Sequence, residues 1–300
     1  MKNIKPSFCK LDMAHLFDGL FVPTNGRERG RLYVAPRRFG DVEVSFQGFA
    51  QLGPADQSIL LAVAAQLGID GKEFGENKGG EEQAALWKKL QVEGNTEGAV
   101  CGSIKTTLYS IMRDAGYENL KATEDAKACL KRLGNAQVRE VNKASGWDRR
   151  CNLVSFRMNH KDGVVFIATN PRLTGAIFKG QHCKVSLYER NTLETGVAKM
   201  LHCWLSSNIN LGEALGYGNG AAVDTLIPHI WGPGEISRKT KCVRRGQIKD
   251  ALDEIKTNTA RLNRGGGWII DQTSSGMMLV SRPKTLPLVE VAASICESMR

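Results

Sequence analysis

The sequence lacks the patterns that mark membrane and secreted proteins. None of its apolar runs approaches the roughly 18 to 20 residues of a membrane-spanning helix. The segment MKNIKPSFCKLDMAHLFDGLF has neither a continuous apolar core nor a small-residue cleavage site, so we expect no secretory signal. With 300 residues, 42% of them hydrophobic and 24% charged, the chain is expected to form about two globular, cytoplasmic domains.

Metal and catalytic motifs are missing too. No two of the eight cysteines are spaced as C-x-x-C, so we interpret them as free, buried thiols in a reducing compartment. The chain has no G-x-x-x-x-G-K-[ST] for nucleotide phosphates and no His-x-His pair, which rolling-circle nickases use to bind metal. We therefore expect no enzymatic activity, no metal and no cofactor.

The positive charge is the first informative feature. The chain carries 41 Lys and Arg against 31 Asp and Glu, a net charge of +10, which favours a polyanionic partner. Residues 237–264 hold nine basic and three acidic side chains, or +6, whereas residues 1–236 contribute only +4. More than half of the excess therefore lies in less than a tenth of the chain.

The order of predicted elements indicates a winged-helix domain over residues 31–168, after an irregular N-terminal arm at 1–30. Strands are predicted at 32–35 and 41–48, and helices at 54–68, 81–90, 103–116 and 124–133, the last capped by Thr123. Alternating segments at 136–141, 151–158 and 163–168 follow, and Asn159–Asp162 should turn the last two into a hairpin.

A similar order recurs over residues 169–284. Helices are predicted at 170–178, 190–208, 221–232 and 237–262, with a strand at 181–187 and a second hairpin from 268–272 and 277–282. The fold class predicted is therefore α+β, with two tandem winged-helix domains and a C-terminal tail at 285–300.

The segment SRKTKCVRRGQIKDALDEI (237–255) is the strongest candidate for a nucleic-acid site. Its apolar stripe begins only at Ile248, so residues 237–247 are expected to project beyond the core. Eleven helical residues span about 16 Å, enough to cross a DNA major groove of about 12 Å. Arginine suits guanine edges, and lysine and a helix N-terminus suit phosphate. The candidate DNA-binding residues are Ser237, Arg238, Lys239, Lys241, Arg244 and Arg245.

Weaker candidates lie in the first predicted domain. Lys127, Lys131 and Arg132 form a basic outer face on the helix at 124–133, and Lys161 would lie at the tip of the first hairpin. Each is equally compatible with an ordinary solvated surface.

Several stretches together resemble the replication initiators of IncQ-type plasmids, the RepC type. The resemblance runs from about Leu16 to Lys284. It is carried in order by LGPADQSILLAVAAQLG (52–68), NPRLTGAIFKGQHCKVSL (170–187), LETGVAKMLHCWLSS (193–207), AVDTLIPHIWG (222–232), IKDALDEI (248–255) and GGGWII (265–270).

The resemblance implies a protein that binds direct repeats (iterons) in double-stranded plasmid origin DNA in bacterial cytoplasm and helps to open neighbouring AT-rich DNA. The implied partners are a plasmid-encoded helicase and primase, with a possible homodimer through the N-terminal domain. The recognition helix of the family maps onto 237–255, where Thr240, Cys242 and Gly246 interrupt the basic run.

Two other classes stay open from the sequence. A winged-helix transcription regulator would share every feature except the resemblance. A nicking enzyme would need a nucleophile such as Tyr109 or Tyr117, and a structural module would use 32–48 and 103–116 for self-association.

Overall fold

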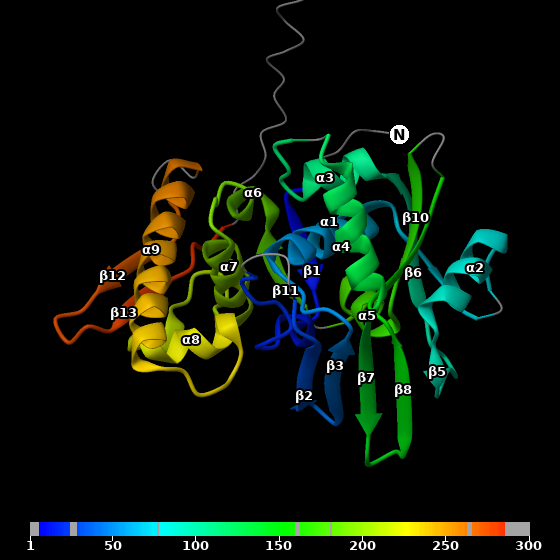
Figure 1. Ribbon diagram of the computed structural model, residues 1–300, viewed down its shortest axis with the longest axis horizontal. Coiled ribbons are helices and arrows are strands. Elements are labelled where there is room, and N and C mark those ends of the chain that lie inside the picture. Colours follow the sequence, from blue (N-terminus) through cyan, green and yellow to red (C-terminus); the bar gives the residue numbers. More distant parts are fainter. Residues whose placement is uncertain are drawn as a thin grey trace, which may run out of the picture.

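Antiparallel sheets flanked by helices make up the chain, which confirms the predicted α+β class (Figure 1). The computed structural model describes residues 6–24, 29–76, 78–119, 121–159, 163–180, 182–262 and 266–285. The predicted tail at 285–300 and Lys161 lie outside these residues, except for Thr285.

A five-stranded sheet forms the lower part of the molecule in Figure 1. Its strands in spatial order are β2 (Leu32–Phe39), β3 (Val42–Gly48), β7 (Ala136–Asn142), β8 (Trp147–Asn152) and β5 (Glu93–Gly94). The predicted hairpin β2–β3 is confirmed, and Gly40 supplies the positive φ of 62° that its turn requires. Val44, Phe46 and Val138 are buried on the inner face of the sheet.

A second sheet continues from the first. Its order is β4 (Lys72–Phe74), β6 (Cys101–Thr107), β10 (Val164–Thr169) and β9 (Val154–Met158). The single strand predicted at 151–158 is wrong, because the chain leaves β8 at Leu153 and enters the other sheet as β9. Leu153 donates its N–H to the Ala136 carbonyl at 2.7 Å, while β9 pairs with β10 as the predicted hairpin.

Helices α1 (Pro54–Asp70), α3 (Leu108–Asp114) and α4 (Thr123–Gly134) pack together, and α2 (Glu81–Leu90) covers the second sheet. The helix predicted at 103–116 is wrong in its first half, which is strand β6. The pairing of β6 with β10, together with β-branched Thr106 and Thr107, outweighs the helical periodicity. Thr123 is the first helical residue, and Ala122 is the N-cap.

The second half contains α5 (Pro171–Phe178), β11 (Cys183–Ser186), α6 (Leu187–Arg190), α7 (Gly196–Asn208), α8 (Val223–Trp231), α9 (Arg238–Leu262), β12 (Ile269–Gln272) and β13 (Met278–Ser281). Short 3-10 turns occur at η1 (Met13–Leu16) and η2 (Leu215–Gly218). The helix predicted at 190–208 is instead α6 and α7. Thr195 begins α7 by accepting a hydrogen bond from Ala198 N–H at 3.1 Å.

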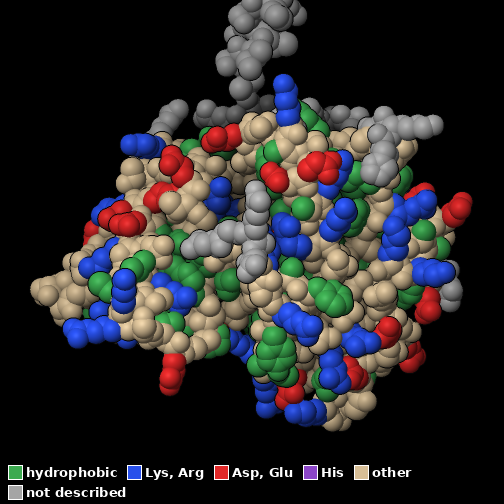
Figure 2. Space-filling view, in the orientation of Figure 1, with side chains coloured by type: hydrophobic (Ala, Val, Ile, Leu, Met, Phe, Trp, Pro, Cys, Tyr) green, Lys and Arg blue, Asp and Glu red, His purple; other side chains and the backbone are tan. Residues whose placement is uncertain are grey.

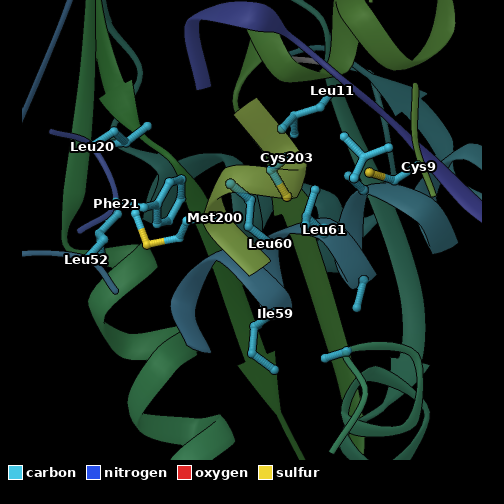
Figure 3. Packing of buried hydrophobic residues seen from close by; sticks show 14 of the residues in the cluster. Cys9, Leu11, Leu20, Phe21, Leu52, Ile59, Leu60, Leu61, Met200 and Cys203 are labelled. Carbon is cyan, nitrogen blue, oxygen red and sulfur yellow. The ribbon is translucent and has the colours of Figure 1, made fainter. Parts of the chain in front are cut away.

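The N-terminal arm is more ordered than predicted. Strand β1 (Phe8–Leu11) pairs antiparallel with β11 of the second half, so the arm predicted to be irregular contains a strand within its described residues. Figure 3 shows Cys9 and Leu11 of β1 beside Leu60 and Leu61 of α1 and near Cys203 of α7. Side chains from both halves therefore share one hydrophobic cluster.

A buried arginine also joins the two halves. Arg190 of α6 is fully buried, and its guanidinium donates to Ser58 Oγ at 2.8 Å and to Gln57 Oε1 at 3.0 Å, both on α1. Its Nε lies 3.1 Å from Cys203 Sγ. These bonds satisfy a charge that would otherwise be costly to bury, so they fix α6 against α1. The domain limits at 31–168 and 169–284 stay a prediction.

Candidate nucleic-acid interface

Helix α9 has two different halves. Its 25 residues span about 37 Å. The buried side chains are Ile248, Ala251, Leu252, Ile255 and Thr259. No side chain of residues 237–247 is buried, which confirms the prediction that this basic segment projects beyond the core. In Figure 1, α9 lies at one end of the molecule beside the β12–β13 hairpin.

Ser237 begins the helix. Its hydroxyl accepts a hydrogen bond from Thr240 N–H at 3.1 Å, and its carbonyl accepts one from Lys241 N–H at 2.9 Å. Ser237 is thus the N-cap of α9. A Cβ at Gly246 would meet nothing within 4 Å, and the helix continues through this position without a break. The first turns of α9 are therefore a regular, exposed helix.

A carboxylate on the neighbouring helix holds two of the basic side chains. Asp224 of α8 accepts hydrogen bonds from Nε and Nη2 of Arg245, and Lys241 Nζ lies 3.0 Å from Asp224 Oδ2. The hydrogen bonds from Arg245 and Lys241 hold the pKa of the Asp224 carboxyl well below its usual range. Lys241 and Arg245 thus face α8 in the unbound protein.

The other three basic residues of the segment, Arg244, Arg238 and Lys239, do not pair with Asp224. The Arg244 guanidinium lies 5.0 Å from the centre of the Trp231 ring, and its partial burial lowers its pKa. Arg238 and Lys239 are exposed, and neither forms an ion pair with any residue that the structure describes. Arg238 and Lys239 are therefore the most available cations of the segment.

Helix α8 is itself held firmly. The His229 ring stacks on Trp204 of α7 with ring centres 4.3 Å apart, and His229 Nδ1 lies 2.8 Å from Asp18 Oδ1 of the N-terminal arm. Hydrogen bonds from His229 and from Arg37 keep the Asp18 pKa low, although burial opposes this. The helix that carries Asp224 thus contacts both α7 and the N-terminal arm.

The hairpin β12–β13 confirms the second predicted hairpin and is fixed to α9. Lys256 Nζ donates to the Ile270 carbonyl at 2.6 Å and lies 2.9 Å from Asp271 Oδ1. Thr259 Oγ1 accepts a hydrogen bond from Trp268 N–H at 3.0 Å. The exposed side of the hairpin therefore keeps one position relative to the basic segment.

The weaker basic face of α4 is only partly free. Lys131 is exposed, and Lys127 Nζ lies 2.6 Å from Glu124 Oε1 on the surface. The expectation that Arg132 lies in solvent is wrong. Its Nε donates to the buried carboxylate of Asp56 at 2.8 Å, which also binds Arg29 at 2.7 Å. The packing of α4 against α1 brings Arg132 and Asp56 together, and this pairing is invisible in the helical pattern.

Most of the described cysteines, and one of the two tyrosines considered as nucleophiles, take part in packing. All seven described cysteines are free, and six are buried as predicted, but Cys242 on α9 is exposed. Burial raises the pKa of Tyr117, whose hydroxyl lies 3.8 Å from Cys129 Sγ, so it is a packing residue. Across the described ranges no group of three or more His, Cys, Asp or Glu could hold a metal ion.

Asp224 and Trp231 are the site residues that the sequence analysis missed. Both lie on α8, seven positions apart, and so on nearly the same side of that helix. This spacing was the one available signal in the sequence. It indicates that an acidic and an aromatic side chain lie on the same side of the helix and can face the same neighbour. Ion pairing across two helices needs their relative placement, which periodicity does not supply.

A family model described as Replication protein C (RepC) matches residues 7–284, which is nearly the whole described chain. No curated protein matches the sequence. No helix within the described residues is long and apolar enough to cross a membrane.

Proposed function

Because the chain belongs to the replication protein C family and is a plasmid replication initiator of that type, we propose that it binds direct repeats (iterons) in double-stranded DNA at the plasmid origin. The observation that carries this proposal is the exposed basic half of α9, anchored to the core only from Ile248 onward. A helix presented in this way fits the width of a major groove.

The element order supports a winged-helix reading of the second half. Helices α7, α8 and α9 pack together and precede the hairpin β12–β13. In this proposal α9 is the recognition helix and the hairpin is the wing. Ser237, Arg238 and Lys239 contact phosphates at the N-terminal end, while Arg244 and Arg245 reach base edges.

The first half is proposed to be the other winged helix of the tandem. Helices α1, α3 and α4 pack together and are followed by the hairpin β9–β10. Lys127 and Lys131 would contact DNA from α4. Arg132 contributes by holding α4 against α1 through Asp56 rather than by an exposed charge.

The protein is proposed to open DNA by binding alone, without catalysing a reaction and without a cofactor. Copies on adjacent repeats bend the duplex and favour opening of neighbouring AT-rich DNA, at a deformation cost of a few kcal/mol that phosphate contacts offset. The plasmid-encoded helicase and primase then load on the opened strands. A nicking activity is the contrary case, and supercoiled plasmid cut in Mg²⁺ or Mn²⁺ would establish it.

The test is a footprint on the origin with Arg238→Ala/Lys239→Ala. The control is Lys72→Ala/Lys88→Ala, which removes two exposed cations from β4 and α2 at the other end of the molecule (Figure 1). We expect repeat protection to be lost in the first variant only. With about six phosphates neutralised, log K should fall with log salt at a slope near −5. Equal protection by both variants, or a flat salt response, would remove α9 from the interface.

A transcription regulator without a replication role is the alternative. It would protect an operator in the same footprint, but it would leave adjacent AT-rich DNA resistant to single-strand-specific nuclease. An initiator should make that tract sensitive when it occupies the repeats on supercoiled DNA.

Self-association is proposed to involve the N-terminal half, giving a monomer–dimer equilibrium. Sedimentation of the full chain should then depend on protein concentration. One species at every concentration would contradict a dimer.

A further inference from the structure

The outer face of the five-stranded sheet carries two unusually exposed aromatic side chains. Tyr33 on β2 is 71% exposed, and Phe49 just after β3 is 82% exposed. Tyr33 pairs in register with Gln47, which pairs with Gln137 of β7, so the three occupy one row across the sheet. Gln47 Nε2 donates to Gln137 Oε1 at 3.1 Å. The row therefore presents one aromatic ring beside two amides.

A shallow hollow separates the two aromatic rings. It has a volume of about 390 Å³, and its lining is Arg31, Tyr33, Gln47, Phe49, Asn135 and Gln137. Each of these six residues brings an aromatic, amide or guanidinium group, and Leu32 and Gly48 complete the wall. Arg31 is exposed and pairs with no carboxylate among the residues that the structure describes. The hollow thus combines flat rings with hydrogen-bonding groups and one unpaired cation.

A larger hollow of about 600 Å³ shares Tyr33 and Gln47 with the first. Here the Nε of Arg139 donates to both carboxylate oxygens of Asp148 at 3.1 Å, and Arg150 pairs with Glu93. Both arginines are exposed, and their pairing across the strands holds the guanidinium groups at the sheet surface. Figure 2 shows hydrophobic, basic and acidic side chains interspersed over this lower part of the molecule.

This combination suits unpaired bases better than a protein surface. Bases stack on exposed aromatic rings and on arginine planes, and amides bond to base edges that pairing would otherwise hide. A protein-docking patch of this size would be expected to expose aliphatic side chains as well, whereas the two aromatics are the large exposed apolar residues lining the smaller hollow. The single unpaired arginine supplies charge complementarity to a phosphate.

We propose that the outer face of this sheet, around Tyr33 and Phe49, binds single-stranded DNA. The inference rests on the proposed function, in which AT-rich DNA opens beside the bound repeats and exposes such strands. Holding one strand on the sheet would prevent its re-pairing while α9 stays on duplex DNA. The two surfaces belong to different elements, so their activities can be separated by mutation.

The test uses the full chain, a labelled 30-nucleotide oligothymidine and a duplex carrying one repeat, with binding followed by fluorescence anisotropy. In Tyr33→Ala/Phe49→Ala we expect at least a tenfold loss of oligothymidine affinity and unchanged duplex affinity, because each stacked base contributes strongly. Tyr109→Ala is the matched control, since it removes an aromatic side chain that is 57% exposed on α3. Tyr33→Phe should retain binding.

The salt dependence of the affinity also distinguishes the two sites. With one or two phosphate contacts, oligothymidine binding should fall with log salt at a slope near −1, against about −5 for the duplex. Unchanged oligothymidine affinity in the double variant would overturn the proposal. So would tighter binding of the corresponding RNA, or a change in sedimentation alone, which would make the face a contact between copies. Loss of duplex binding in the Arg238→Ala/Lys239→Ala variant does not bear on this site, so the two hypotheses fail separately.

Discussion

Asp224 on α8 binds Arg245 on α9 through two oxygens, and the same carboxylate lies 3.0 Å from Lys241. Two cations of the proposed DNA-contacting segment thus share one carboxylate from within the chain. DNA must compete with this carboxylate for both of them. Asp224 is therefore expected to reduce binding to arbitrary DNA more than binding to a repeat, where base contacts add to the affinity.

The first prediction is that Asp224→Asn raises affinity for a random duplex. The freed Lys241 and Arg245 can then neutralise phosphates, so the salt slope should become steeper by about 1 to 2. Asp271→Asn is the control, because Asp271 pairs with Lys256 on the same helix but away from the basic segment. A random-duplex affinity and slope equal to those of the unaltered protein would show that Asp224 does not compete with phosphate.

The second prediction concerns pH. His202 Nε2 lies 3.0 Å from Glu189 Oε2 in the core. Burial lowers the His202 pKa, but hydrogen bonds to Cys203 and Glu189 and the nearby carboxylate outweigh it, and the net pKa is raised above 6.5. A raised folded-state pKa contributes stability that is complete below pH 6.5 and is lost as pH rises through the folded value.

The unfolding midpoint should therefore fall as pH rises above 6.5, and His202→Gln should lose this part of the pH dependence. Denaturant unfolding at several pH values measures both. A slope that persists unchanged in His202→Gln would assign the effect to another group. His182, which is not buried, serves for the matched substitution His182→Gln.

The third prediction compares the stability lost on substituting Arg132 with that lost on substituting the exposed Lys131 beside it. Arg132→Ala should lower the free energy of unfolding by about 2 kcal/mol, because it removes one of two guanidinium partners from the buried Asp56 carboxylate. Lys131→Ala should change it by less than about 0.5 kcal/mol. Thermal or urea unfolding gives both values. Equal stability in the two variants would show that Arg29 alone satisfies Asp56.

Helix α9 illustrates what periodicity can predict. The start of its apolar stripe at Ile248 was enough to place residues 237–247 outside the core, and the hairpin that follows was visible as alternation. Both features depend on neighbours close in sequence. The helical stretch predicted at 103–116 failed because β6 owes its conformation to β10, about 60 residues away.

Side-chain pairing in the candidate site could not be predicted from periodicity either. The basic character of α9 is a property of its own residues, but the pairing of Arg245 with Asp224 depends on how α8 crosses it. Arg132 is a sharper example, since its helix predicts an outward position while Asp56, 76 residues earlier, draws it inward. The exposed pair Tyr33 and Phe49 was likewise hidden, because hydrophobicity alone suggests burial.

Strand β1 pairs with β11, which is formed by residues about 175 positions later in the chain. During synthesis Phe8–Leu11 therefore leaves the ribosome long before its partner exists. At about 5 to 20 residues per second, the strand waits roughly 10 to 35 s with its edge and with Cys9 and Leu11 unprotected. The first half therefore cannot finish folding until the second half is made. A chain truncated before β11 would keep an unpaired strand edge, which is prone to aggregation.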